Sequence, residues 1–497
     1  MRGRAHPASY RTACLVLVLS FLAGAATAAP AIGPEGARHL LNRTGFDARP
    51  ARIDEIAGLS RSEAAEAVLA GNAKSAGTPA PAWVGEFISP RRVREYTEAE
   101  RMQFQRQLVA RGIELKNWWV TEMLTTHSPL TERMTLFWHN HFTSSLQKVR
   151  SASLLYRQNV VLREHALGNF ATLLKAASKD PAMLVYLDSA ANRRGQPNEN
   201  FAREVMELFT LGEGKYTEQD IREAARAFTG WSIDLDSGEY LWRPLAHDAG
   251  PKTVLGKSGW LDGGDVLDIL LARPETAEFV VAKLWKEFVS PQPDAAEVRQ
   301  IAAVFRESRY DIKTALRALL SSDAFYDDRN RGALIKSPVD LVIGTMRQFN
   351  VGYSDPLPLT VLLRNLGQDL FSPPNVKGWP GGEAWINSTT LLARRQFLER
   401  LFRVDEARMQ ARMVEAPTGQ GAANFQRERL MRASLEIRFS GSEWVREFEA
   451  RAGQGARAVN HMQLVLLPTP PASDGAAEGQ GVELVRRITA DPAYQLK

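Results

Sequence analysis

Hydrophobic residues with helical spacing run through most of this chain and constrain its fold more than any other feature. Apolar residues recur every three or four positions over residues 98–127, and the pattern continues over 131–142 and 152–177. Asp180 directly before Pro181 is typical of an N-cap followed by proline at the first helical position. The chain is therefore predicted to fold into many amphipathic helices.

A strand signal is clear at only one place. In residues 231–242, apolar and aromatic residues flank the turn sequence Asp236-Ser237-Gly238, which predicts a β-hairpin. A loop rich in Gly, Pro and Trp covers residues 372–387. The predicted fold class is mainly α: a large multi-helix domain with a small β-hairpin and long Gly/Pro/Trp-rich loops.

The first 28 residues have the three regions of a secretory signal peptide. Three arginines precede the apolar run 13–24, and Ala26-Thr27-Ala28 supplies a small-residue cleavage site. The run is too short to span a bilayer, and no later stretch reaches the ~20 apolar residues of a transmembrane helix. We therefore expect a periplasmic or secreted protein with no transmembrane segment after signal cleavage.

Removal of that segment also changes the charge and the cysteine content. The full chain has 62 basic and 57 acidic residues, and without the three signal-peptide arginines the balance is 62 − 3 = 59 against 57, or +2. A near-neutral exported protein has no electrostatic reason to bind nucleic acid. The only cysteine, Cys14, lies in the apolar run, so the remaining 497 − 28 = 469 residues have no thiol.

Composition divides the rest of the chain into three parts. Residues 29–410 carry the helical patterns and are predicted to form the main domain. Residues 411–458 change in composition, with Gly/Ala linkers around an Arg- and Glu-rich helix, and are predicted to be a variable, mobile insertion. Residues 459–497 are expected to form a linker and a helix that closes the same domain.

The densest group of polar side chains within an apolar pattern is Phe137-Trp138-His139-Asn140-His141-Phe142. Two histidines two residues apart on a helix point about 160° away from each other, so they cannot share one metal ion. His141 falls on the apolar side of the helix and His139 on the other. We expect His141 to be buried, either as a hydrogen-bonded core histidine or as a metal ligand or general base.

A second constellation lies on the next predicted helix. Glu204 and Glu207 share a face with Asn200, which suits a paired acid/base site or a hard-metal site. The apolar arc of this helix lies opposite, so the alternative is a solvated face with Glu199 paired to Arg203. The catalytic interpretation requires another helix, such as the histidine helix, to cover the glutamates and form a cleft.

Two weaker signals complete the candidate site. His247 and Asp248 would form a base with an orienting acid, although adjacent residues rarely achieve that geometry. Several tryptophans lie in loops beside Gly or Pro, where they would either stack on sugars or anchor the loops to the core. These tryptophans are Trp231, Trp260, Trp379 and Trp385.

The strings FWHNHF, DPAMLVYLDSAANRRGQPNENFAREVMELFTLGEGKYTEQDI, ARAFTGW, HDAGPKTVLG and PNVKGWPGGEAWINSTTLLAR occur in this order. In them the chain resembles the bacterial family called domain of unknown function 1800 (DUF1800), from about Ala37 to Lys497. The resemblance is weakest over 414–455. It implies an exported, mostly helical protein, with a gene neighbour from the sulfatase-related domain of unknown function 1501 family, and it brings no activity. The residues that correspond to the family signature are His139, His141, Asn198, Glu199, Asn200, Arg203, Glu204, Glu207, Trp231, His247, Asp248 and Trp379.

The first functional hypothesis is an extracytoplasmic hydrolase or group-transfer enzyme with a His/Glu site. The candidate catalytic residues are His141, Glu204, Glu207, His139, Arg203 and Asp248. A divalent metal, if used, would bind His141, Glu204 and Glu207. The candidate substrate-binding residues are Asn198, Asn200, Trp231, His247 and Trp379.

The second hypothesis comes from a different class of protein. A non-catalytic protein would hold a polysaccharide with its loop tryptophans, or would act as a scaffold for a partner of the domain of unknown function 1501 family. A carboxylate pair within reach of His141 would favour the enzyme. A shallow groove lined by tryptophans, with salt-paired glutamates, would favour the binding protein.

Overall fold

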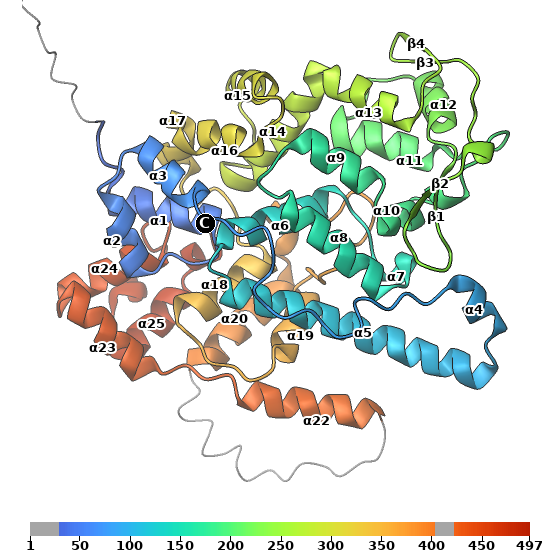
Figure 1. Ribbon diagram of the computed structural model, residues 1–497. Helices are drawn as coiled ribbons and strands as arrows, with labels where there is room; N and C mark the ends of the chain where they lie inside the picture. Colours follow the sequence, from blue (N-terminus) through green and yellow to red (C-terminus); the bar gives the residue numbers. More distant parts are fainter. Residues whose placement is uncertain (1–28, 403–421) are drawn as a thin grey trace, which may run out of the picture.

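The computed structural model describes residues 29–402 and 422–497 (Figure 1). In this part the chain is mainly α-helical, as predicted, with two small two-stranded antiparallel sheets. The predicted signal peptide with Cys14, and the first residues of the predicted insertion (411–421), lie outside the described residues. No helix in the described ranges is both long enough and apolar enough to cross a bilayer.

The helices are joined by connections that range from short turns to long loops. The first ten are α1 (Gly33–Thr44), α2 (Pro50–Ala57), α3 (Arg61–Leu69), α4 (Pro90–Glu95), α5 (Glu98–Thr125), α6 (Pro129–His141), α7 (Leu146–Val149), α8 (Ala152–Glu164), α9 (Phe170–Ser178) and α10 (Pro181–Tyr186). Next come α11 (Glu199–Glu204), which continues directly into the π-helix η2 (Val205–Thr210), then α12 (Glu218–Ala227), α13 (Gly263–Ala272), α14 (Pro274–Phe288), α15 (Ala295–Glu307), α16 (Ile312–Ser321) and α17 (Asp323–Tyr326).

The remaining helices are α18 (Pro338–Gln348), α19 (Leu357–Asn365), α20 (Ser388–Phe402), α22 (Ala422–Leu435), α23 (Gly441–Ala452), α24 (Ala456–Leu466) and α25 (Gly481–Ala490). Helices α23, α24 and α25 contact one another, and they return to the body because α24 contacts α1 and α25 contacts α20 (Figure 1). The C-terminal part of the chain thus packs beside its first helix.

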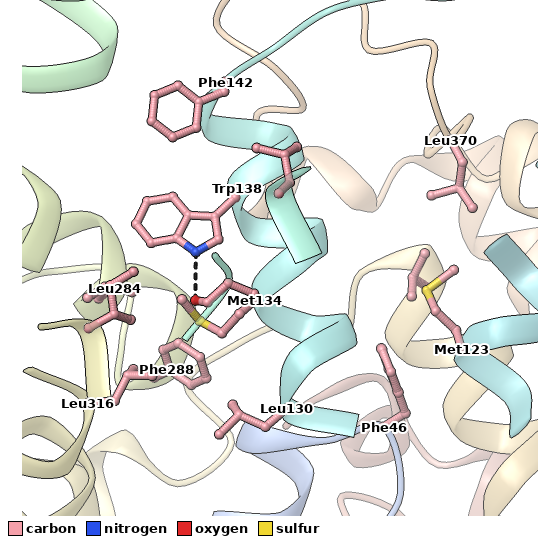
Figure 2. Close-up of a cluster of buried hydrophobic side chains, with 14 of the residues drawn as sticks. Phe46, Met123, Leu130, Met134, Trp138, Phe142, Leu284, Phe288, Leu316 and Leu370 are labelled. Atoms are coloured by element: carbon pink, nitrogen blue, oxygen red, sulfur yellow. Dashed lines mark hydrogen bonds between the residues drawn. The ribbon is translucent and has the colours of Figure 1, made fainter. Parts of the chain in front are cut away.

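Helix α6 runs through the core. Along it, Leu130, Met134 and Trp138 are at most 2% exposed. Figure 2 shows these side chains with Leu284 and Phe288 of α14 at their side. The indole nitrogen of Trp138 donates to the Ala166 carbonyl (2.9 Å), which satisfies the polar atom of a fully buried ring. Burial on this scale fixes the position of the two histidines at the C-terminal end of α6.

The pattern over 152–177 predicted continuous helix, and the structure corrects this. The chain forms two helices, α8 and α9, with a break at residues 165–169. Asn169 caps α9 by accepting from the amide of Thr172 (3.0 Å). The Gly168 carbonyl accepts from the amide of Ile312 at the start of α16 (2.9 Å). Tertiary hydrogen bonding thus interrupts a helical hydrophobic pattern.

The predicted hairpin is confirmed as β1 (Trp231–Ile233) paired with β2 (Tyr240–Trp242). A second hairpin, which was not predicted, pairs β3 (Lys252–Val254) with β4 (Lys257–Gly259). Its two turn residues, Leu255 and Gly256, both have positive φ. A leucine in this conformation is uncommon, and this explains why residue types alone gave no turn signal.

Candidate functional site

His141 is bonded through both ring nitrogens. Its Nε2 lies 3.1 Å from the Phe209 carbonyl and its Nδ1 lies 3.1 Å from Nζ of Lys283. Because the carbonyl needs a donor and the ammonium is one, Nε2 carries the proton and Nδ1 accepts. Lys283 also donates to the Leu208 carbonyl (2.9 Å). Together the two side chains satisfy carbonyls in the last turn of η2, which is the place where a helix attracts cations.

Burial lowers the pKa of both groups. His141 is 3% exposed, and desolvation together with the Lys283 charge holds its pKa well below the usual range. Burial lowers the pKa of Lys283 to about 7. His141 was expected to be buried, and it is. The structure gives it the hydrogen-bonded core position that was one of the two alternatives.

His139 was placed on the polar side of its helix, and the structure shows that it is buried too, at 1% exposure. Three aromatic rings cover it, with centroid distances of 5.4 Å to Trp119, 5.2 Å to Phe371 and 5.7 Å to Trp379. Its Nε2 has no hydrogen-bond partner among the described residues, and burial lowers its pKa to about 3. Periodicity missed this because helix α5 and the 372–387 loop cover that face.

Asn140, between the two histidines, holds the 372–387 loop against α6 through two hydrogen bonds. Its Oδ1 accepts from the amide of Trp379 (2.7 Å) and its Nδ2 donates to the carbonyl of the same residue (3.3 Å). Gly378 has φ +83°, and a Cβ there would lie 2.2 Å from Asn140 Oδ1. The Asn-Gly contact explains why a loop distant in sequence lies tightly on the end of α6. Trp379, 4% exposed, serves as its buried anchor.

The two glutamates lie at the junction of α11 and η2, in different surroundings. Glu207 accepts a hydrogen bond from the Tyr216 hydroxyl (3.0 Å), and Nζ of Lys377 lies 3.7 Å from its Oε1. Glu204 is partly buried and has no hydrogen-bond partner in the described part of the chain. Desolvation raises the pKa of Glu204, and the neighbouring Glu207 charge raises it further. π-helical turns are frequent at functional sites.

Arg203 and the asparagines of this region have structural partners. Arg203 donates two hydrogen bonds to Glu218 of α12 (2.8 Å each) and contacts Glu199 at 3.4 Å, which confirms the Glu199–Arg203 pair. Asn198 caps α11 by accepting from the amide of Asn200 (2.9 Å), whose own side chain donates to the Leu187 carbonyl (3.2 Å).

His247 and Asp248 do not act on each other. Asp248 receives two hydrogen bonds from Arg226, through Nε (2.8 Å) and Nη2 (3.1 Å), and this guanidinium lowers the pKa of the carboxyl. Nδ1 of His247 lies 2.9 Å from the Thr229 carbonyl. Trp231 is 3% exposed and packs on Phe228, with ring centroids 5.1 Å apart.

The predicted residues therefore meet in two groups rather than in one. His139, His141 and Trp379 form a buried group at the end of α6, while Glu204 and Glu207 lie partly exposed at the α11–η2 junction. Within the described ranges, no three or more His, Cys, Asp or Glu side chains are arranged to hold a metal ion, so the proposed metal ligands are not assembled as a set.

Three residues of these groups were not predicted from the sequence: Lys283, Tyr216 and Lys377. Lys283 carried a signal, since it interrupts the apolar run FVVAKLW of α14. Tyr216 and Lys377 carried none, because each reaches Glu207 from a loop. Among the loop tryptophans, Trp385 is 7% exposed and Trp260 is 81% exposed.

A depression of about 410 Å³ lies elsewhere, between α15 and α16. None of the predicted site residues contributes to its lining, which includes Glu297, Gln300 and Asp323. It therefore gives no support to either functional hypothesis.

Comparison with known proteins gives a family but no annotated activity. The family model described as a protein of unknown function (DUF1800) matches residues 39–496, nearly the whole chain. No curated protein and no solved structure shows significant similarity. The chain belongs to the DUF1800 family.

Proposed function

We propose that this protein is an enzyme of the hydrolase or group-transfer class that acts in the periplasm or outside the cell, with Glu204 and Glu207 as its acid/base pair. The export rests on the signal-peptide pattern of the first 28 residues. Compared with the sequence-based hypothesis, the site moves from His and Glu together to the glutamates alone. His139 and His141 become residues that hold the surrounding elements in place.

One observation carries the proposal: two carboxylates one helical turn apart differ in their hydrogen-bond partners. Glu204 lacks a hydrogen-bond partner in the described part of the chain and has a raised pKa. Glu207 accepts a hydrogen bond from the Tyr216 hydroxyl, and its Oε1 lies 3.7 Å from Nζ of Lys377. Pairs of titratable groups whose surroundings differ in this way are typical acid/base assignments.

In the proposed reaction, each carboxyl moves one proton. Glu207 accepts a proton from the attacking water or hydroxyl group, and Glu204 gives its proton to the oxygen of the leaving group as that bond breaks. The Tyr216 hydroxyl orients Glu207 through its hydrogen bond. The π-helix contributes geometry, because its wide turn sets the direction of Glu207 relative to Glu204.

The test uses the chain from Ala29 onward and a panel of chromogenic esters, glycosides and phosphoesters. General acid–base catalysis is typically worth about 10²–10⁴-fold in rate, so Glu204→Gln and Glu207→Gln should each lower kcat by that order. Glu199→Gln is the matched control, since it lies on the same helix and contacts Arg203. Activity that survives in the double variant E204Q/E207Q would refute the assignment.

A non-catalytic glycan-binding protein is the second candidate, and the 81% exposure of Trp260 favours it. An open indole face stacks on a sugar ring without any catalytic group. Trp260→Phe should then reduce the quenching of tryptophan fluorescence by bacterial polysaccharides. Silence of the wild-type protein across a broad polysaccharide panel would remove this candidate.

A further inference from the structure

We propose that the segment Trp242–Leu245, together with three neighbouring arginines, binds the surface of membranes that contain anionic lipids. The segment ends β2 and enters the 3₁₀ turn η3 (Pro244–Ala246). Unlike the proposed acid/base pair, this surface has no catalytic role, so the inference does not depend on the proposed function.

Leu245 is the most exposed large hydrophobic side chain in the described ranges, at 93%, and Trp242 is 37% exposed. A single exposed apolar residue needs no explanation. Here, however, an aliphatic side chain at the tip of a turn stands three residues from an aromatic one. Leucine and tryptophan beside basic residues are typical of segments that lie in the membrane interface.

The fold holds this apolar tip rigidly. The Trp242 ring packs against His247 (centroids 4.9 Å apart), and a Cβ on Gly230 would lie 2.9 Å from the same indole ring. The amide of Arg243 donates to the Gly230 carbonyl (2.9 Å). The amide of Asp248 donates to the Thr229 hydroxyl (2.7 Å). His247 and Asp248, which have no part in the proposed acid/base pair, thus support the turn that exposes Leu245.

The charge around the tip is positive. Arg243 lies within the segment, and the amide of Arg194 donates to the Ala246 carbonyl (2.7 Å), which brings the exposed Arg193-Arg194 pair beside η3. None of the three arginines forms an ion pair with an acidic residue in the described part of the chain, although Arg193 donates to the Gln196 side chain (2.6 Å) and Arg243 to the Ile233 carbonyl (3.4 Å). Three guanidinium groups that no acidic side chain neutralises, beside an apolar tip, complement an anionic lipid surface.

An acidic polysaccharide would also attract these arginines, but it would not use Leu245. Sugars are bound through aromatic stacking and hydrogen bonds, and an isolated aliphatic side chain offers neither. The exposure of Leu245 is the observation that favours lipid over polysaccharide, and substitution of this residue separates the two.

The experiment is co-sedimentation of the chain from Ala29 onward with phosphatidylcholine vesicles, with and without phosphatidylglycerol. We expect binding only to the phosphatidylglycerol vesicles. The variant R193Q/R194Q/R243Q should lose about a hundredfold in affinity, because each arginine near an anionic surface contributes roughly fivefold. Leu245→Asp should abolish binding, whereas the control Leu392→Asp, at a leucine 57% exposed on α20, should leave it unchanged.

A thiol label gives a second readout that does not depend on affinity. Because Cys14 is the only cysteine, L245C and L392C in the chain from Ala29 each carry one thiol for an environment-sensitive dye. The dye at 245 should shift to the blue on phosphatidylglycerol vesicles and the dye at 392 should not. No sedimentation of the wild-type chain, equal effects at 245 and 392, or binding to polygalacturonate in place of vesicles would overturn the proposal.

Discussion

The end of α6 and the α11–η2 junction carry the two densest polar motifs of this chain, yet the fold treats them in opposite ways. At the end of α6, both histidines are at most 3% exposed, and between them Asn140 fastens a distant loop. At the α11–η2 junction, Glu204 and Glu207 remain partly open and differ in their partners. A polar motif on a helix of this protein is therefore either part of the packed core or a partly exposed surface, depending on which elements cover it.

At the buried end of α6, the largest loss of stability is expected when the 372–387 loop is separated from Asn140. Gly378→Ala would put a Cβ 2.2 Å from Asn140 Oδ1 and would also strain a residue with φ +83°. We expect a loss of about 3–5 kcal/mol in the free energy of unfolding, measured by urea denaturation. Gly381→Ala is the control, since its φ is also positive but nothing lies within 4 Å. It should cost about 1 kcal/mol. Equal losses in the two variants would contradict the proposed role of the contact between Asn140 and the 372–387 loop.

The two buried histidines at the end of α6 should differ in how much each contributes to stability. His141→Phe leaves the Phe209 carbonyl without its donor and Lys283 with only the Leu208 carbonyl as acceptor, which should cost about 2–4 kcal/mol of stability. His139→Phe removes a buried nitrogen that has no partner among the described residues, and the new ring stays among aromatic neighbours. It should change stability by no more than about 1 kcal/mol. Thermal or urea unfolding of both variants checks the difference, and a larger loss for His139→Phe would reverse the roles assigned to them.

The buried histidines also predict a pH dependence. Because the folded-state pKa of His139 is about 3, against 6.5 for the ordinary group, the unfolded chain binds the proton first as the pH falls. The stabilisation is complete above pH 6.5 and is lost progressively between pH 6.5 and 3. For His139 alone this loss is about 2 kcal/mol between pH 7 and pH 5. His139→Phe should therefore flatten the stability profile by that amount. An unchanged slope would mean that His139 is protonated in the folded protein.

Local signals in the sequence predicted much of the fold. The Asp180 cap and the following Pro181 begin α10 as predicted, and the 231–242 hairpin has the predicted strands. The break between α8 and α9 was not predictable, because it depends on hydrogen bonds to residues about 140 positions away in sequence. Helix periodicity places a side chain on a face but does not show which element covers that face.

The candidate site shows the same limit. The pairing of Glu199 with Arg203 follows from their i, i+4 spacing and was predicted. The burial of His139 was not, since Trp119 and Phe371 come from distant segments. The difference between Glu204 and Glu207 was also hidden, because Tyr216 and Lys377 reach Glu207 from loops with no regular pattern.

The proposed function depends most on Glu204 as the proton donor of the acid/base pair. The most direct test is a ¹³C NMR titration of the glutamate carboxyl groups in the chain from Ala29 onward, with Glu204 assigned as the signal that disappears in E204Q. We expect this carboxyl to titrate above the ordinary value of 4.5, because burial and the Glu207 charge both raise its pKa. Titration at or below 4.5 would rule out Glu204 as the proton donor.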